Sequence, residues 1–259
     1  MMKKGIIIGF VLSLVLSLSF HLFAAERKPI LHVQPNKIHI NAFFKGQKIK
    51  IFGYVPKNWD VAIKICGSRE EVTLKRKGKV GILWMNVGTV KVKNAPNFYL
   101  IATSTDIDKL ASPDVLKKAE IGYDALKDKI KFESTVPGDK PDFLFKQFVM
   151  LKKKEKLYSI HPKTVVFEGV NNGLKSFSTT INVPAKIPLG KYTVDLYGFN
   201  NGQLVGHLES FFHVDLVGFP AFCRNLAFKH SLLYGILAVI LAIVVGFFMG
   251  FLFGSKGGH

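Results

Sequence analysis

The feature that most constrains this chain is an apolar run near its C-terminus. The segment 231–253 contains no charged side chain. A helix rises about 1.5 Å per residue, so a helix of this length crosses the roughly 30 Å of a bilayer core. A soluble core helix is rarely apolar on all sides over that distance. We therefore predict one transmembrane helix at 231–253, followed by a short cytoplasmic tail at 254–259.

The N-terminus carries the pattern of an export signal. Lys3 and Lys4 precede an apolar stretch at 5–23, and Ala24-Ala25 separates that stretch from charged residues. This order is typical of a signal peptide. The cleavage motif is incomplete, because a large side chain stands where a small one is needed. Residues 1–25 are therefore either a cleaved signal peptide or an uncleaved N-terminal anchor.

Both alternatives place the middle of the chain outside the cytoplasm. Lys3 and Lys4 retain the N-terminus in the cytoplasm, and long domains translocate largely regardless of charge. Arg224 and Lys229, just before the last helix, argue for the opposite orientation. We follow the first segment, since it usually dominates. The prediction is a bacterial inner-membrane protein with a periplasmic main domain and one span, or two spans if the signal is uncleaved.

The segment between the membrane-directed ends, 26–225, reads mainly as short strands. Apolar and polar residues alternate from 31 to 104 and again from 163 to 217. Two Asn-Asn-Gly tripeptides, 171–173 and 200–202, are strong hairpin signals. We predict a mainly β fold, an immunoglobulin-like β-sandwich with an inserted helical pair at about 106–157. One sandwich with an insertion and two smaller strand units remain open alternatives.

The helical pair is predicted from a change of period. Ser112 is suited to cap a helix that starts at Pro113, and apolar residues then recur at helical spacing up to Ile130. A second apolar pattern of this kind runs over 142–157. The two helices would therefore lie in one stretch between the two sets of strands.

A basic segment is the densest unusual patch of the extracytoplasmic part. The chain carries 36 Lys and Arg against 18 Asp and Glu, a net charge of +18, which favours anionic lipids, nucleic acid or acidic partners. Export argues against nucleic acid. The candidate contact for an anion or a lipid headgroup consists of Lys75, Arg76, Lys77, Lys79 and Trp84. Alternatively, Trp84 is the core tryptophan of the sandwich and the lysines are a solvated hairpin tip with its turn at Lys77-Gly78.

No residue set carries a recognisable catalytic pattern. The sequence has no GxSxG, no HExxH and no glycine-rich phosphate loop, so we predict no catalytic residues, no metal and no cofactor. His207, Glu209 and His213 would share one strand face, either as a metal arrangement or as the wet face opposite the core. Cys66 and Cys223 are either a disulfide or two unrelated thiols.

The transmembrane segment itself offers a candidate helix-packing face. Gly246, Gly250 and Gly254 recur every four residues, and such positions stack on one side of a helix. Glycines on one face allow a second helix to approach closely. We expect this face to bind a polytopic membrane protein or a second copy of the chain.

Several motifs together resemble a known family. They are Glu71-Val72-Thr73-Leu74-Lys75-Arg76-Lys77, Gly81-Ile82-Leu83-Trp84-Met85-Asn86, Pro96-Asn97-Phe98-Tyr99, Leu157-Tyr158, Pro188-Leu189-Gly190-Lys191-Tyr192, Val217-Gly218-Phe219 and Tyr234-Gly235. In these motifs the chain resembles the uncharacterised "putative transmembrane protein" family described from alphaproteobacteria. The resemblance implies a signal sequence, an ectodomain and one C-terminal span. It also implies an association with sulfite-exporter-like permeases, and it supplies no catalytic residues.

Three functions follow as hypotheses. The first is a membrane-tethered, non-catalytic accessory or partner-binding subunit of a polytopic membrane protein. The second is an envelope-structural protein that binds anionic lipid through its basic surface. The third is a periplasmic metal-handling protein or an enzyme whose site is assembled from distant residues.

Overall fold

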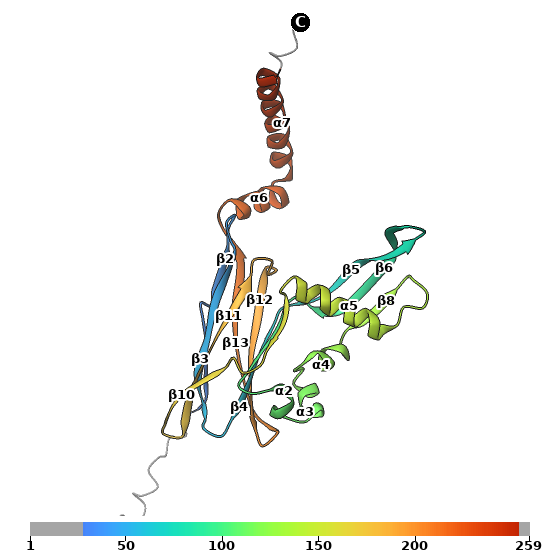
Figure 1. The fold of residues 1–259 in the computed structure, drawn as a ribbon. Helices are drawn as coiled ribbons and strands as arrows, with labels where there is room; N and C mark the ends of the chain where they lie inside the picture. The colour runs from blue at the N-terminus through green and yellow to red at the C-terminus, as the bar shows by residue number, and fades with distance from the viewer. Residues whose placement is uncertain (1–27, 254–259) are drawn as a thin grey trace, which may run out of the picture.

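A computed structural model describes residues 28–253 and shows a β-rich body with one helix extending from it (Figure 1). Its strands are β1 (Ile30–Gln34), β2 (Lys37–Ile40), β3 (Gly46–Pro56), β4 (Asp60–Cys66), β5 (Arg69–Val80), β6 (Leu83–Pro96), β7 (Tyr99–Thr103), β8 (Lys131–Ser134), β9 (Tyr158–His161), β10 (Val166–Asn171), β11 (Leu174–Pro184), β12 (Gly190–Asn200) and β13 (Gln203–Leu216). Its helices are α2 (Ile107–Leu110), α3 (Pro113–Lys118), α4 (Tyr123–Lys127), α5 (Pro141–Lys154), α6 (Gly218–Lys229) and α7 (Ser231–Phe253).

Two sheets form the body. A four-stranded sheet has the order β1-β3-β11-β10, and a six-stranded sheet has the order β2-β13-β12-β4-β7-β9. Pairing is antiparallel except between β2 and β13 and between β7 and β9. Alternate side chains of both sheets are buried in one apolar core, as in β11, where Phe177, Ile181 and Val183 are buried. The predicted mainly β sandwich with one C-terminal apolar helix is confirmed.

The two Asn-Asn-Gly tripeptides form hairpin turns as predicted. Asn172 and Gly173 join β10 to β11, and Asn201 and Gly202 join β12 to β13. All four residues have positive φ, between 49° and 79°. Asparagine and glycine adopt this conformation readily, and two such residues in succession fit the twist of antiparallel strands.

The six-stranded sheet is covered on its second face near its centre. Every residue of β7 is buried, and five successive residues of β4 are buried. The covering segment is the stretch that contains α3 and α4. The Tyr99 hydroxyl donates a hydrogen bond to Glu120 O at 2.8 Å and accepts one from the Gly122 backbone N–H at 3.0 Å. These bonds attach the covering segment to the sheet.

That segment differs from the predicted helical pair. The stretch 106–157 contains four short or medium helices and strand β8. The first predicted helix is split into α3 and α4 by a turn in which Glu120 and Gly122 have φ of 53° and 97°. Buried Tyr99 stabilises that turn, which the helical spacing of the apolar residues did not reveal. The second predicted helix corresponds to α5.

A third sheet forms a lobe beside the sandwich. It has the order β5-β6-β8 and packs against α5, which buries Leu144, Phe145, Phe148 and Val149. Phe132 of β8 contacts the α5 side chains Phe145 and Phe148 edge to face. The turn predicted at Lys77-Gly78 is wrong, because β5 continues to Val80 and the chain turns at Gly81-Ile82.

The chain leaves the sandwich through α6 and α7. Figure 1 shows α6 lying across one end of the sandwich and α7 extending away from it. The Val217 N–H donates to Ile40 O at 2.9 Å, which holds the start of α6 against β2. The bounds of α7 match the predicted span. The signal peptide or anchor predicted at 1–25 and the tail predicted at 254–259 lie outside the described residues.

Candidate functional site

Helix α7 is the one helix of residues 28–253 that is long and apolar enough to cross a membrane. None of its residues is buried. Gly246 and Gly250 border a shallow groove of about 590 Å³, which is also lined by Ile243, Phe247 and Phe251. A Cβ at either glycine would meet no atom within 4 Å, so the groove is free for another helix. Gly254, the third residue of the predicted face, lies outside the described residues.

The side of α7 that carries Gly246 and Gly250 has further small residues toward the start of the helix, and we call this side the small face. Its small residues lie three or four positions apart, so they fall within one side of the helix. They are Gly235, Ala238, Ala242, Gly246 and Gly250. Spacing of four residues favours a right-handed crossing with close backbone approach.

The predicted basic patch lies on the β5–β6 hairpin. Lys75, Lys77 and Lys79 are exposed and alternate along β5, so they share one face of the sheet. Lys79 pairs across the hairpin with Trp84. Among the described residues, none of these three lysines takes part in an ion pair. They are therefore available to an external anion.

Arg76 has a different role from its neighbours. Its guanidinium lies 3.4 Å from the Asp139 carboxylate and 5.3 Å from the centre of the Phe143 ring. Asp139 also accepts a hydrogen bond from the Ser134 hydroxyl at 2.8 Å. Arg76 therefore joins the hairpin to the loop before α5, and it borders the same groove as Lys75, Lys77 and Trp84.

Trp84 is not the core tryptophan of the sandwich. It is 72% exposed at the tip of the hairpin. The tryptophan that packs against the core is Trp59, whose ring fills the space above Gly198 and Gly206. The alternative that placed Trp84 in the core is wrong, because the β5–β6 hairpin extends beyond the sandwich.

A buried polar cluster on the six-stranded sheet was missed by sequence reasoning. Lys64 Nζ donates to the Ala119 carbonyl at 3.1 Å and to the Tyr197 hydroxyl at 2.9 Å, and it lies 3.8 Å from the Asp195 carboxylate. Burial raises the pKa of the Tyr197 phenol, and the hydrogen bond from Lys64 acts in the opposite direction. The cluster therefore pairs a buried ammonium with a neutral phenol and a carboxylate. These contacts hold β4, β12 and the end of α3 together.

His207 belongs to the rim of that cluster. Its Nε2 lies 2.9 Å from the Asp195 carboxylate, and its ring stacks on Tyr197 with 4.8 Å between the ring centroids. His207, Glu209 and His213 do lie on the face of β13 opposite the core. Six residues of extended strand separate the two histidines by about 20 Å, so they do not share one ion. Among residues 28–253, no three His, Cys, Asp or Glu side chains form a metal-binding group.

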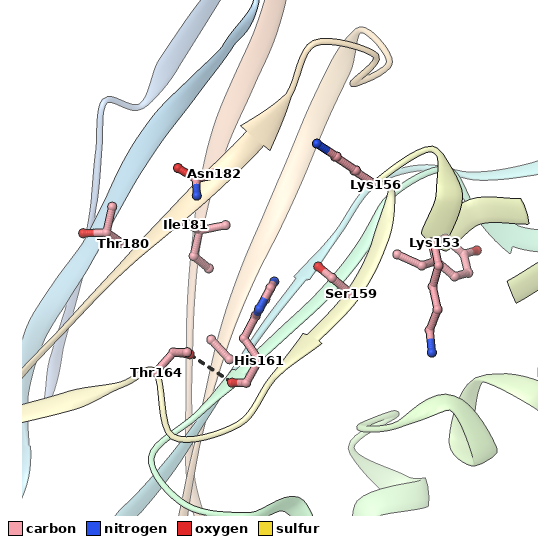
Figure 2. Close-up of a pocket in the computed structure, with 10 residues that line it drawn as sticks. Lys153, Lys156, Ser159, His161, Thr164, Thr180, Ile181 and Asn182 are labelled. Atoms are coloured by element: carbon pink, nitrogen blue, oxygen red, sulfur yellow. Dashed lines mark hydrogen bonds between the residues drawn. The ribbon is translucent and has the colours of Figure 1, made fainter. Parts of the chain in front are cut away.

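A cavity of about 360 Å³ lies between β9, β11 and the end of α5. Figure 2 shows that its polar side chains do not converge: Lys153 points away from Thr180 and Asn182. The Lys153 amine lies 4.5 Å from the centre of the Tyr123 ring. The cavity therefore lacks a set of groups aimed at one ligand.

The two cysteines are both free thiols in the structure. Cys66 ends strand β4, and Cys223 lies in α6. Burial raises the pKa of the Cys66 thiol, so it stays protonated and unreactive near neutral pH.

Sequence reasoning also overlooked the apolar end of the hairpin. Ile82, Leu83 and Met85 belong to the stretch predicted as strands, yet all three are exposed. A run of large apolar residues directly after a basic stretch and a glycine was the available signal. The Lys64 cluster had no such signal, because β4 and β12 are far apart in the sequence.

Comparisons with known proteins give one result about the identity of the chain. No curated protein matches it. A family model described as "Putative transmembrane protein (Alph_Pro_TM)" matches residues 30–255. The match includes the whole sandwich, the lobe and α7. Because it covers most of the sequence, the chain belongs to this family of transmembrane proteins.

Proposed function

We propose that the protein is a membrane-tethered, non-catalytic module that binds a polytopic membrane protein as an accessory subunit. The observation that carries this proposal is the small face of α7, with its groove beside Gly246 and Gly250. A plain anchor needs only apolar side chains. In lipid, helices associate by close packing instead of by the hydrophobic effect, and small residues permit that packing.

The occupant of the groove is a transmembrane helix of the partner. The resemblance described above makes a sulfite-exporter-like permease the class to test first. The sandwich and its lobe would then be held beside the partner on the outer side of the membrane.

The partner hypothesis is tested by Gly246→Leu and Gly250→Leu. In each variant the leucine side chain would occupy the groove. We therefore expect the polytopic partner to be lost from a crosslinked pull-down of the full chain from native membranes. Val244→Leu is the matched control, because position 244 lies about 180° from the centre of the small face. A reporter assay for transmembrane homodimers separates a partner protein from a second copy of the chain.

Unchanged pull-down and unchanged dimer signal in both glycine variants would reject the α7 face as a binding site. The partner would then have to contact the ectodomain. Loss of the dimer signal alone would make the occupant a second copy of the chain.

The periplasmic location belongs to the same proposal. It rests on Lys3 and Lys4 ahead of the first apolar stretch. Alkaline phosphatase fused after Val217 should be active, because it folds only after export, and a fusion at His259 should be inactive. The reverse pattern would place the sandwich in the cytoplasm.

A further inference from the structure

We propose that the tip of the β5–β6 hairpin inserts into the interface of the bilayer that holds α7. The apolar tip, defined as Val80, Ile82, Leu83, Trp84 and Met85, would enter the headgroup region. Lys75, Lys77 and Lys79 would contact the phosphates of anionic lipids. The ectodomain would then touch the membrane at a second place, separate from α6 and α7.

The first argument is exposure. Ile82 is 90% exposed and Trp84 is 72% exposed, and the other members of the apolar tip are also exposed. Hairpin turns in water usually carry polar residues, as the two Asn-Gly turns of the sandwich do. A contiguous exposed apolar patch marks a surface that another phase or molecule covers.

The second argument is charge and residue type. Three lysines that form no ion pair with any residue of 28–253 alternate along β5 directly behind the apolar tip, and Lys79 is the cross-strand neighbour of Trp84. Tryptophan is enriched at membrane interfaces, where its ring is apolar and its N–H remains hydrated. Lysines within a Debye length of an anionic leaflet are attracted to it. The apolar tip and the three lysines behind it therefore match a lipid interface in residue type and in charge.

The third argument is position. In Figure 1 the β5–β6 hairpin projects sideways from the sandwich and rises in the same direction as α7. The β10–β11 hairpin is at the end of the sandwich away from α6 and α7. Phe219 and Phe222, one helical turn apart on α6, are exposed as well. Because α7 is part of the same chain, it keeps the bilayer close to the hairpin, which raises the effective concentration of lipid there.

The fourth argument is that the lobe holds the hairpin in place. The Arg76–Asp139 ion pair joins β5 to the loop before α5. The Thr135 hydroxyl also accepts a hydrogen bond from the Thr89 N–H at 2.9 Å, which ties β6 to the end of β8. A hairpin that is ordered before contact loses little conformational freedom on insertion.

The test uses the full chain reconstituted into vesicles of phosphatidylethanolamine and phosphatidylglycerol. The chain has two tryptophans, so the difference between the wild type and Trp84→Phe reports Trp84 alone. We expect that difference signal to be blue-shifted and to lose most of its intensity when the acyl chains carry bromine. Trp59 packs over the glycines near the far turn and should be insensitive to bromine.

The variants Ile82→Asp and Leu83→Asp should abolish the quenching of Trp84. Val170→Asp is the matched control, since Val170 is an exposed apolar residue of the β10–β11 hairpin, at the end of the sandwich away from α6 and α7. Replacing phosphatidylglycerol by phosphatidylcholine should weaken the quenching of wild-type Trp84, because the lysines lose their anionic partners.

Trp84 emission that is typical of water and unaffected by bromine would overturn the proposal. Site-directed crosslinking from position 82 in native membranes identifies the alternative. Crosslinks to lipid would support insertion, whereas crosslinks to a membrane protein without bromine quenching would make the apolar tip a protein-binding surface. Because only lipid is present in the vesicles, failure of this test leaves the α7 partner hypothesis standing.

Discussion

The β12–β13 and β5–β6 hairpins have similar lengths and opposite surroundings. In β12 and β13, Tyr192, Val194, Leu196 and Phe212 are buried in the sandwich core. At the end of β5–β6, Leu83, Trp84 and Met85 are exposed although they are equally apolar. Burial in the sandwich stabilises the fold. The exposed tip contributes nothing comparable to the stability of the fold, and in our proposal it contacts lipid instead.

The largest expected effect is the loss of a core side chain of the sandwich. Phe212 is fully buried and stacks on Tyr192 with 5.0 Å between the ring centroids. Phe212→Ala should lower the free energy of unfolding by about 3–5 kcal/mol, because it removes apolar contacts and leaves a cavity.

The matched variant is Leu83→Ala in the apolar tip. Its expected effect on the free energy of unfolding is within about 0.5 kcal/mol, because surface substitutions rarely cost more. Thermal unfolding of the full chain in detergent measures both. A large loss of stability in Leu83→Ala would mean that the tip is part of the fold after all, and the contrast between the two hairpins would fail.

A smaller effect is expected where Trp59 closes the end of the sandwich. A Cβ at Gly198 would lie 2.0 Å from Cε3 of the Trp59 ring, so Gly198→Ala forces the ring to move. We expect a loss of about 1–3 kcal/mol in the free energy of unfolding, the usual cost of overpacking. In a Trp59→Ala background the same substitution should cost much less, because the obstructing ring is absent. Equal costs in both backgrounds would show that Trp59 does not contact Gly198.

The smallest expected effect is a pH dependence confined to the sandwich. Burial raises the pKa of the Cys66 thiol above its ordinary value of 9.0. Stability from this group is fully present below pH 9.0 and falls as the pH rises toward the raised pKa, since the unfolded chain then loses the proton first.

Denaturant unfolding of the wild type between pH 8 and pH 10 should therefore show declining stability. Cys66→Ala should show a shallower decline over the same range. The tip variants Ile82→Asp and Leu83→Asp should keep the slope of the wild type, because they leave the buried thiol unchanged. An identical slope in Cys66→Ala and the wild type would show that Cys66 does not contribute to the pH dependence of stability.

Local patterns predicted much of the sandwich. The turns at Asn172-Gly173 and Asn201-Gly202 follow from two residues that tolerate positive φ, and α7 follows from the absence of charge over 231–253. The single helix expected from Pro113 to Ile130 was wrong at Gly122. Its apolar spacing was helical, yet a hydrogen bond to Tyr99, distant in the sequence, fixes a turn there.

Some features of the candidate sites also follow from local patterns, and others depend on contacts between distant parts of the chain. The sequence indicated the lysines of β5 and the glycines of α7, because both are local patterns. It did not indicate that Arg76 forms an ion pair with Asp139, whereas the lysines beside it form none within the part of the chain that the structure describes. It also left open whether Trp84 packs against the core, since which tryptophan does so depends on how β4, β12 and β13 pair.

By itself, the sequence determined that this chain has an apolar C-terminal span and a β-rich body, and where the β10–β11 and β12–β13 hairpins turn. These features follow from composition and from residues adjacent in the chain, whose periodicity decides between helix, strand and membrane segment. Only the tertiary structure decided that Lys64 is buried against Tyr197 and that the apolar tip is left uncovered. Both outcomes depend on pairing between strands distant in the sequence, because burial is a property of what packs around a residue.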